Sequence, residues 1–263
     1  MRQKFRIGAF AAPLVAAACA TGSPVTPAPS WETIFDGDSL TGWTPKIVGQ
    51  EAGSDATGIF RAENGEILIS YDAYSEFDGT FGHLFFDQDL SNYRLRFEYR
   101  FFGDQAEGGP GWAFMNSGVM VHAQPPETMR QDQAFPVSVE AQLLGKDVET
   151  TARTTANICT PGTHISQRGE RLTQHCINSA TPAVLAGEWV TFEIDVRSGD
   201  MMRLLIAGEE AFRLDTPVYD ERDGDVAALG LSGPVTHGYF ALQAESHPVA
   251  FRNIQLLRLD PSD

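Results

Sequence analysis

Apolar and polar residues alternate with a period of two along several short segments of the chain. The clearest case is residues 93–101, in which every second residue is apolar and the residues between are Arg or Glu. Successive side chains of a strand point to opposite faces, so this pattern predicts a strand with one buried face. Similar alternation predicts strands at 66–70, 190–196, 201–207, 226–231, 238–244 and 249–259.

Turn-forming residues separate these segments. They include Asp36-Gly37-Asp38, Glu63-Asn64-Gly65 and Asp223-Gly224-Asp225, and Gly, Asn and Asp are residues that tight turns favour. No segment has a sustained helical period, so many short strands joined by turns predict an all-β sandwich or barrel. We expect loops at 103–112, which is rich in Gly, and at 146–182, which is polar and rich in Thr.

Two neighbouring segments, 116–122 and 135–145, carry polar residues within apolar strands. In the second segment, alternation places Glu140 and Gln142 on the face opposite to the apolar residues. In the first, it places His122 on the face opposite to the valines. If both strands belong to one sheet, a carboxylate, an amide and an imidazole converge on one surface. This surface is the candidate site.

The first 18 residues predict an export signal, because a basic start is followed by an apolar run that is too short to span a bilayer. Cys19 lies in a context that resembles a bacterial lipobox, so we expect its lipidation; cleavage near Ala20 by the ordinary signal peptidase is the alternative. Residues 19–30 contain three prolines and predict an extended tether. Residues 31–263 then form one domain. We therefore expect an exported protein, periplasmic or held at the outer membrane as a lipoprotein.

Acidic residues dominate the charge of the chain. It contains 35 acidic and 19 basic residues, a formal net charge of −16 at pH 7. Such a surface repels nucleic acid and anionic lipid. We therefore expect no nucleic-acid partner, contact with a membrane only through the lipid anchor, and a neutral substrate.

Cys159 and Cys176 are the two cysteines that follow Cys19. In an exported protein such a pair predicts a disulfide, which stabilises the fold by roughly 3 kcal/mol on the chain-entropy model. Two free buried thiols are the alternative. A zinc site is disfavoured, because the nearby His164 and His175 lack the paired-cysteine spacing of structural zinc sites.

Six motifs in order carry a family resemblance. They are FDGDSLTGW at 35–43, NYRLRFEY at 92–99, NSGV at 116–119, EAQLL at 140–144, GEWV at 187–190, and LQAE at 242–245 leading into PVAFRNI at 248–254. On these motifs the sequence resembles the 3-keto-disaccharide hydrolase family, formerly a domain of unknown function, over roughly residues 31–259. The segments around the two cysteines lie outside this pattern.

The resemblance implies a concanavalin-like jelly-roll β-sandwich of two antiparallel sheets that acts on sugars oxidised at C3. A ketone at C3 acidifies the C2 hydrogen, and the C1 leaving group is then β to the carbanion. Elimination followed by hydration would therefore cleave the glycosidic bond, given a base, an oxyanion donor and an acid. A glycoside or oligosaccharide is the expected substrate, and a separate oxidoreductase is expected to make the 3-keto group. No dinucleotide-binding motif occurs in this chain.

Candidate residues for these roles come from the strands and their ends. The candidate catalytic residues are Glu140, His122 and Glu245, and the candidate substrate-binding residues are Asn116, Gln142, Arg130, Trp112 and His247. All of them except Glu245 also have a structural interpretation: Glu140 in a salt bridge with Arg130, His122 as a surface imidazole, the amides satisfying backbone groups, Trp112 covering a core edge, and His247 in a turn. His83, His164, His175 and His237 are interpreted as structural.

Two further alternatives remain open. The sequence requires no cofactor, although a divalent metal on His122, Glu140 and Glu245, or calcium on a loop, is conceivable. Glu140 is followed by Gln142 and not by the second carboxylate of glucanase strands, which argues against ordinary two-carboxylate hydrolysis. A non-catalytic, lectin-like envelope protein is the alternative to an enzyme, since such folds host binders as well.

Overall fold

The computed structural model describes residue 1 and residues 30–147 and 152–260. The predicted signal peptide, the lipidation site Cys19 and the tether therefore lie outside the described residues, apart from Met1 and Ser30. No helix among the described residues is long and apolar enough to cross a membrane.

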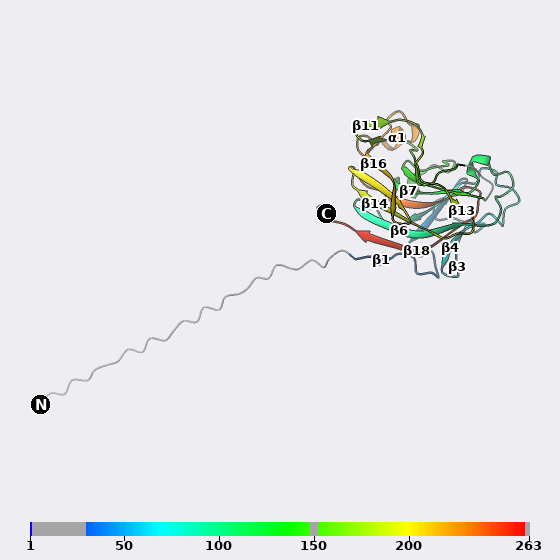
Figure 1. Ribbon diagram of the computed structural model, residues 1–263, viewed down its shortest axis with the longest axis horizontal. Coiled ribbons are helices and arrows are strands. Elements are labelled where there is room, and N and C mark those ends of the chain that lie inside the picture. The colour runs from blue at the N-terminus through cyan, green and yellow to red at the C-terminus, as the bar shows by residue number, and fades with distance from the viewer. Residues whose placement is uncertain (2–29, 148–151, 261–263) are drawn as a thin grey trace.

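Two β-sheets make up the described part of the chain, as the alternation predicts (Figure 1). Sheet A has the order β11-β10-β16-β15-β14-β6-β18-β4-β3, with β1 paired to β18. Its strands are β1 (Glu32–Thr33), β3 (Phe60–Glu63), β4 (Glu66–Ile69), β6 (Tyr93–Phe101), β10 (Thr163–Gln167), β11 (Glu170–Leu172), β14 (Val190–Arg197), β15 (Met201–Ile206), β16 (Glu209–Tyr219) and β18 (Val249–Arg258).

Sheet B has the order β12-β9-β8-β7-β17-β5-β2, and a short strand, β13, adds to β8 in parallel. Its strands are β2 (Trp43–Ile47), β5 (Gly82–Phe86), β7 (Asn116–Ala123), β8 (Val139–Lys146), β9 (Asn157–Cys159), β12 (Cys176–Ile177), β13 (Val184–Leu185) and β17 (Tyr239–Ala244). All pairings along the main path of both sheets are antiparallel, which confirms the predicted jelly-roll sandwich.

The core between the sheets follows the alternation of β6. The apolar residues of β6 are all at most 1% exposed, and the ring of Phe97 lies 5.1 Å from that of Phe192 and 5.3 Å from that of Phe251. Figure 1 shows the strands that carry these rings, β6, β14 and β18, in one layer. On the opposite face the arginines pack on aromatic rings, with Arg96 4.0 Å above the Trp31 ring. Each face of β6 thus has the environment that its residues require.

Two predicted segments differ in the structure. Residues 226–231 were predicted to be a strand, but residues 224–229 form the helix α1 (Gly224–Leu229). Asp223 caps its first turn by accepting from the backbone N–H groups of Asp225 and Val226, and Gly230 ends it with a left-handed φ of 66°. The capping residues therefore outweigh the short apolar alternation between them.

The predicted loop at 146–182 is also more regular than expected, because it contributes β9, β10, β11 and β12. The Gly-rich segment 103–112 is a loop, as predicted, and ends in the short 3₁₀ helix η1 (Gly111–Ala113). The insertion that carries the cysteines thus extends both sheets.

The Phe97 cluster should dominate the stability of the sandwich. We expect Phe97→Ala to lower the free energy of unfolding by about 3–5 kcal/mol, because it removes a buried ring between two others, whereas Glu209→Ala on an exposed strand position should change it by less than about 0.5 kcal/mol. Urea unfolding followed by fluorescence measures both. An equal, small effect of the two substitutions would show that the cluster does not hold the sheets together.

Candidate active site

The outer face of sheet B carries a buried polar cluster that is built by strand register. Glu140 on β8 pairs with Met120 on β7, and Gln142 pairs with Gly118. Glu140 and Gln142 thus point away from the core, as predicted, while their apolar neighbours face it. Gly118 makes room for this arrangement, because a Cβ there would lie 2.8 Å from Glu140 Oε1 and 3.1 Å from Gln243 Oε1.

A cavity of about 370 Å³ lies over this cluster. Its walls come from η1, β7, β8, β9, β12 and the end of β17. The lining residues are Trp112, Asn116, Phe135, Glu140, Gln142, Cys159, Pro161, His175, Cys176 and Glu245. Five residues predicted from the sequence as candidates for catalysis or substrate binding therefore share one cavity, which we call the Glu140 cavity.

Two carboxyl groups in the cavity perturb one another. Glu140 is 6% exposed and Glu245 2% exposed. Burial raises the pKa of Glu140 to about 8, and a hydrogen bond from the Gln243 amide opposes the rise. Burial, followed by repulsion from Glu140, raises the pKa of Glu245 well above its ordinary value, while Arg153 opposes this shift. Near neutral pH the pair therefore holds protons that exposed carboxylates would have lost.

Amide and carboxyl oxygens in this cluster lack a protein partner. Among the described residues, no hydrogen bond reaches Asn116 Oδ1, Glu140 Oε1, Gln243 Oε1 or Glu245 Oε2. Buried oxygens of this kind are normally hydrogen-bonded. The site therefore offers acceptors that hydroxyl groups of a bound molecule can satisfy.

Trp112 provides the apolar wall of the cavity. Its side chain is 56% exposed and its ring stacks on Phe81 with an interplanar angle of 10° and a centroid distance of 5.8 Å. Its backbone carbonyl accepts hydrogen bonds from Asn116 Nδ2 at 3.4 Å and from Arg153 Nη2 at 3.5 Å. The ring is therefore held flat at the rim of the cavity, in a position suited to stacking on a sugar.

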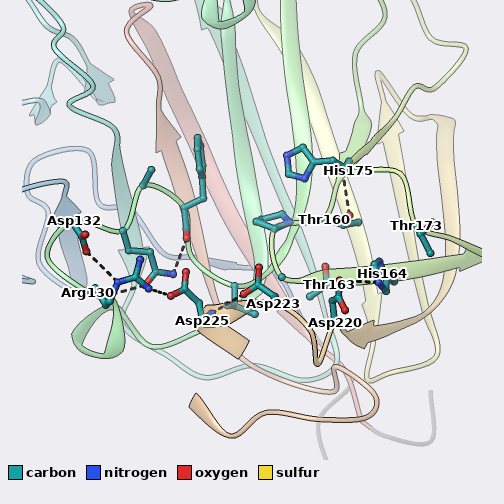
Figure 2. Close-up of a pocket in the computed structure, with 16 residues that line it drawn as sticks. Arg130, Asp132, Thr160, Thr163, His164, Thr173, His175, Asp220, Asp223 and Asp225 are labelled. Carbon is teal, nitrogen blue, oxygen red and sulfur yellow. Dashed lines mark hydrogen bonds and ion pairs between the residues drawn. The ribbon is translucent and has the colours of Figure 1, made fainter. Parts of the chain in front are cut away.

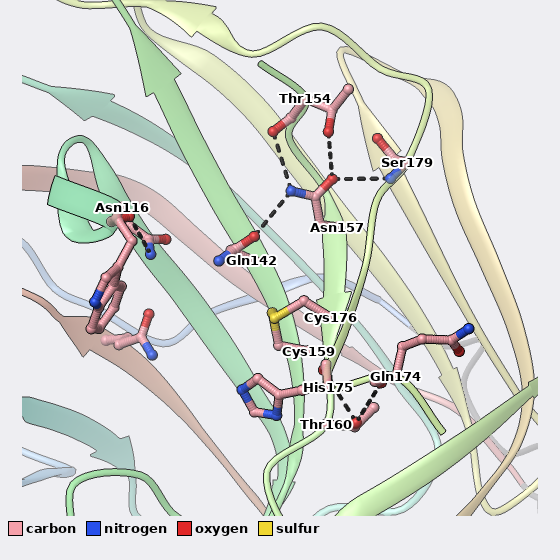
Figure 3. Close-up of a disulfide and its surroundings, with 12 residues drawn as sticks. Asn116, Gln142, Thr154, Asn157, Cys159, Thr160, Gln174, His175, Cys176 and Ser179 are labelled. Atoms are coloured by element: carbon pink, nitrogen blue, oxygen red, sulfur yellow. Dashed lines mark hydrogen bonds between the residues drawn. A yellow bond between two sulfur atoms is a disulfide. The ribbon is translucent and has the colours of Figure 1, made fainter. Parts of the chain in front are cut away.

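The predicted disulfide between Cys159 and Cys176 is formed and borders the same cavity (Figure 3). Cys176 pairs with Cys159, and Cys159 pairs in turn with Glu140 on β8. One cross-strand row thus runs from Glu140 to the disulfide. Because the bond joins the edge strand β12 to β9, it fixes the wall of the cavity next to the carboxyl pair.

His122 does not join this site, and the prediction that it converges with Glu140 is wrong. Between Met120 and Ala123, β7 has one residue more than the paired segment of β17, and His122 has a φ of 49°. This bulge reverses the alternation, so the His122 ring contacts the core residue Tyr93 at 6.3 Å and borders a different cavity. Burial and the nearby His237 lower the pKa of His122 to about 3.

Arg130 and His247 also lie outside the Glu140 cavity. Arg130 forms ion pairs with Asp132 and Asp225 and lines a neighbouring cavity, so the alternative interpretation, a salt bridge with Glu140, does not hold either. The His247 ring is fully buried between Phe101 and Phe114, at 5.9 and 5.2 Å. Burial lowers the pKa of His247 to about 4. Its position is that of a packed ring behind the site.

No group of three His, Cys, Asp or Glu side chains among the described residues is arranged to hold a metal ion. The ligand set conceivable from the sequence, His122 with Glu140 and Glu245, is not assembled, because the bulge in β7 directs His122 away from both carboxyl groups.

Several residues of the site were missed from the sequence. Gln243 belongs to the same alternation as Glu245, and that signal could have revealed it. His175 lies beside Cys176 and lines the Glu140 cavity, although we interpreted it as structural. Arg153 could not be identified, because its approach to Glu245 depends on how the 146–182 segment folds back: its Nη1 donates to the Gly145 carbonyl at 2.9 Å.

A row of three polar residues runs across neighbouring strands of sheet B, from Gln243 on β17 through β5 to β2. His83 on β5 pairs with Gln243 on one side and with Lys46 on the other. Lys46 is 2% exposed and donates to the carbonyls of Ile47 at 3.2 Å and Gln131 at 3.3 Å. Burial, followed by the charge of Lys46, lowers the pKa of His83 to about 3. His83 therefore stays neutral at the edge of the carboxyl cluster.

Comparison with known proteins identifies relatives at the level of family and fold. The sequence profile of the 3-keto-alpha-glucoside-1,2-lyase-like domain family matches residues 30–257. No curated protein sequence matches the chain significantly.

Two solved structures from Parabacteroides distasonis ATCC 8503, each provisionally named a glycosyl hydrolase, share the architecture. One is 20% identical with a TM-score of 0.52 and covers 88% of this chain and 94% of its own. The other is 16% identical with a TM-score of 0.50 and covers 88% of this chain and 100% of its own. At this level of identity the likeness establishes the fold.

The raised pKa of Glu140 predicts how stability depends on pH. The folded protein keeps a proton on Glu140 that the unfolded chain releases near pH 4.5. The stability that protonated Glu140 contributes is therefore complete below that pH and is lost as pH rises through about 8. Between pH 5 and 9, Glu140→Gln should therefore gain stability relative to the wild type, by on the order of 3 kcal/mol. Urea unfolding at several pH values measures this, with the exposed Glu188→Gln as the control. Parallel pH profiles of all three proteins would contradict the assignment.

Proposed function

Because the chain belongs to the 3-keto-alpha-glucoside-1,2-lyase-like family, and is thus a carbohydrate-active enzyme at family level, we propose that it cleaves the glycosidic bond of 3-keto-glycosides by elimination and hydration. The observation that carries this proposal is the buried pair Glu140 and Glu245 in one cavity with the exposed ring of Trp112. Such chemistry needs a base for the C2 proton and a proton donor in the same site.

Glu140 is the proposed base. Its Oε1 is buried without a protein partner among the described residues, and its pKa of about 8 suits proton abstraction near neutral pH. A carbon acid next to a ketone is a weak acid, so a carboxylate of raised pKa has a larger driving force for accepting its proton than an exposed one. Gly118 leaves the space above β7 that the carboxyl group of Glu140 occupies, and Glu140 in turn lines the cavity that a substrate would enter.

Glu245 is the proposed donor to the developing enolate oxygen. Burial, and then repulsion from the charge of Glu140, raises the pKa of Glu245, so its carboxyl group stays protonated when Glu140 is ionised. A neutral carboxyl in an apolar site can donate a hydrogen bond where charge develops in the transition state. Asn116 and Gln142, which line the same cavity, are the proposed partners of sugar hydroxyls.

The proposed reaction is an elimination followed by a hydration. Glu140 takes the proton from C2, and the electron pair of that bond delocalises onto the C3 oxygen. Its return forms the C1=C2 double bond and breaks the bond from C1 to the leaving-group oxygen, which receives a proton. Addition of water across C1=C2 completes a net hydrolysis. No oxidant or reductant is consumed, so the ketone must be made beforehand by a separate oxidoreductase.

Trp112 and the charge of the chain agree with a neutral sugar as substrate. The exposed indole offers an apolar face to the ring, while the acidic balance of the sequence favours no anionic ligand. Export through the predicted leader and a lipid anchor at Cys19 would place this activity in the periplasm or at the outer membrane, where glycosides arrive from outside.

Ordinary glycosidase chemistry is the second candidate, and one observation favours it. The second carboxylate that is missing from β8 is supplied by Glu245, from the end of β17. Two carboxyl groups in one cavity are also the equipment of two-carboxylate hydrolysis, which needs no ketone. A carbohydrate-binding protein without activity is the remaining alternative.

Dependence on the ketone separates these functions. The purified protein, incubated with a 3-keto-glucoside and with its unoxidised parent, should release the aglycone from the keto form alone, because only that form has an acidic C2 hydrogen. Release is measured by chromatography. Cleavage of the parent as well would establish the two-carboxylate route, and binding of either sugar without cleavage would establish a lectin-like protein.

Replacement of the base should abolish turnover and preserve binding. We expect Glu140→Gln to lower kcat on the keto substrate by about 10²–10⁴-fold, with a substrate Kd within a fewfold of the wild type, measured by calorimetry. In the wild type, kcat/KM should rise with pH until Glu140 is ionised, near pH 8. Glu188→Gln serves as the matched control. Full activity of Glu140→Gln would exclude Glu140 as the base.

A further inference from the structure

A second cavity, of about 470 Å³, adjoins the Glu140 cavity (Figure 2). The two share three lining residues, Phe135, Pro161 and His175. A glycoside whose sugar occupies the first cavity can therefore extend its leaving group into the second. The bond that breaks then lies at the boundary between the cavities, where these three residues meet.

Of the three residues at the boundary, His175 is the one that can carry a proton. The side chains of Phe135 and Pro161 have no titratable group. His175 is exposed, and among the described residues no hydrogen bond or ion pair reaches its imidazole ring. A proton donor at this boundary is therefore available without breaking an existing interaction.

The acidic residues of the second cavity are already engaged. Asp132 and Asp225 pair with Arg130, and Figure 2 shows these groups together on one side of the cavity. On the other side, Asp220 contacts His164 Nε2 at 3.1 Å and Arg222 Nε at 3.0 Å. Asp223 caps α1. Each of these carboxylates thus already has a partner, and none of them lines the Glu140 cavity, where the bond would break.

His175 is held in place by its backbone. Its carbonyl accepts hydrogen bonds from the Thr160 backbone N–H at 2.8 Å and from Thr160 Oγ1 at 3.2 Å. The next residue, Cys176, is bonded to Cys159 and paired with it in the sheet. In Figure 3 the imidazole extends from this anchored segment toward the side on which Asn116 lies. The disulfide thus fixes an exposed ring beside the carboxyl pair.

We propose that His175 protonates the leaving-group oxygen as its bond to C1 breaks, and that the Cys159–Cys176 disulfide positions His175 for this step. The proposal rests on the proposed function. In each turnover, Glu140 gains the proton from C2 and His175 gives one to the leaving-group oxygen. Transfer of a proton from Glu140 to solvent and from solvent to His175 restores both groups, so the cycle is balanced.

Leaving groups of different acidity test this role. An alcohol, such as the hydroxyl of a second sugar, leaves poorly without a proton, whereas 4-nitrophenolate leaves without one. His175→Ala should therefore lower kcat/KM for a 3-keto-glucoside with a sugar or alkyl leaving group by about 100-fold or more. Activity toward the 4-nitrophenyl 3-keto-glucoside should stay within a fewfold of the wild type. Added imidazole should restore part of the lost activity.

The controls separate this role from a structural one. His237→Ala removes an exposed histidine that pairs with Asp89 beside a different cavity, and it should leave both activities unchanged. The double variant Cys159→Ser with Cys176→Ser, assayed below its melting temperature, should reproduce the loss on the alcohol substrate, because the covalent bond that holds β12 to β9 is gone.

The outcomes are distinct. An equal loss on both substrates would mean that His175 acts in binding or folding, and unchanged activity would exclude it from the reaction; either overturns the proposal while the proposed function stands. Inactivity of the wild-type protein on both keto substrates overturns the proposed function and this role with it.

Discussion

The site depends on the burial of one carboxyl group on the outer face of a sheet. Glu140 lies over Gly118 because the register of β7 and β8 places Gly118 next to Gln142, and because a glycine leaves that space open. Desolvation then raises the pKa of Glu140 to about 8. A buried carboxyl group costs stability when it ionises. The same burial gives Glu140 the raised pKa that the proposed proton transfer requires.

The buried carboxyl group of Glu140 is surrounded by other polar groups and lies outside the apolar core. Large aliphatic and aromatic side chains line the inner faces of β6, β14 and β18, so the Glu140 cluster on the outer face of sheet B does not interrupt the core. Gln243 is on β17, the strand next to β7, Glu245 follows directly after β17, and Arg153 approaches Glu245 from the inserted segment. The polar groups thus satisfy one another only in part, and three residues with an unpaired oxygen, Asn116, Glu140 and Glu245, line the Glu140 cavity.

The segment 146–182 adds strands and two basic side chains around the Glu140 cavity. It extends sheet B by β9 and β12, supplies Arg153 behind the carboxyl pair, and brings His175 to the boundary of two cavities. The disulfide joins its two parts across one strand pair. A short edge strand such as β12 has few backbone hydrogen bonds of its own, so a covalent bond is an effective way of holding it in position beside a site.

Local alternation determined much of the architecture, because the period of two is a property of each strand by itself. It predicted most of the strands, the buried face of β6, and the outward direction of Glu140 and Gln142; six motifs predicted the family, and the cysteine pair predicted the disulfide. The same reasoning failed for α1, where Asp223 and Gly230 cap a helix. It also failed for His122, where one extra residue in β7 turns the ring into the core. Which strands lie next to one another was decided only by the tertiary structure, since pairing between β7 and β17 brings Glu245 to Glu140 across more than a hundred residues of sequence. The folding of 146–182 likewise brings His175 to their cavity. Side-chain direction is thus encoded locally, whereas the meeting of charged groups from distant strands depends on the energy of the whole packed sandwich.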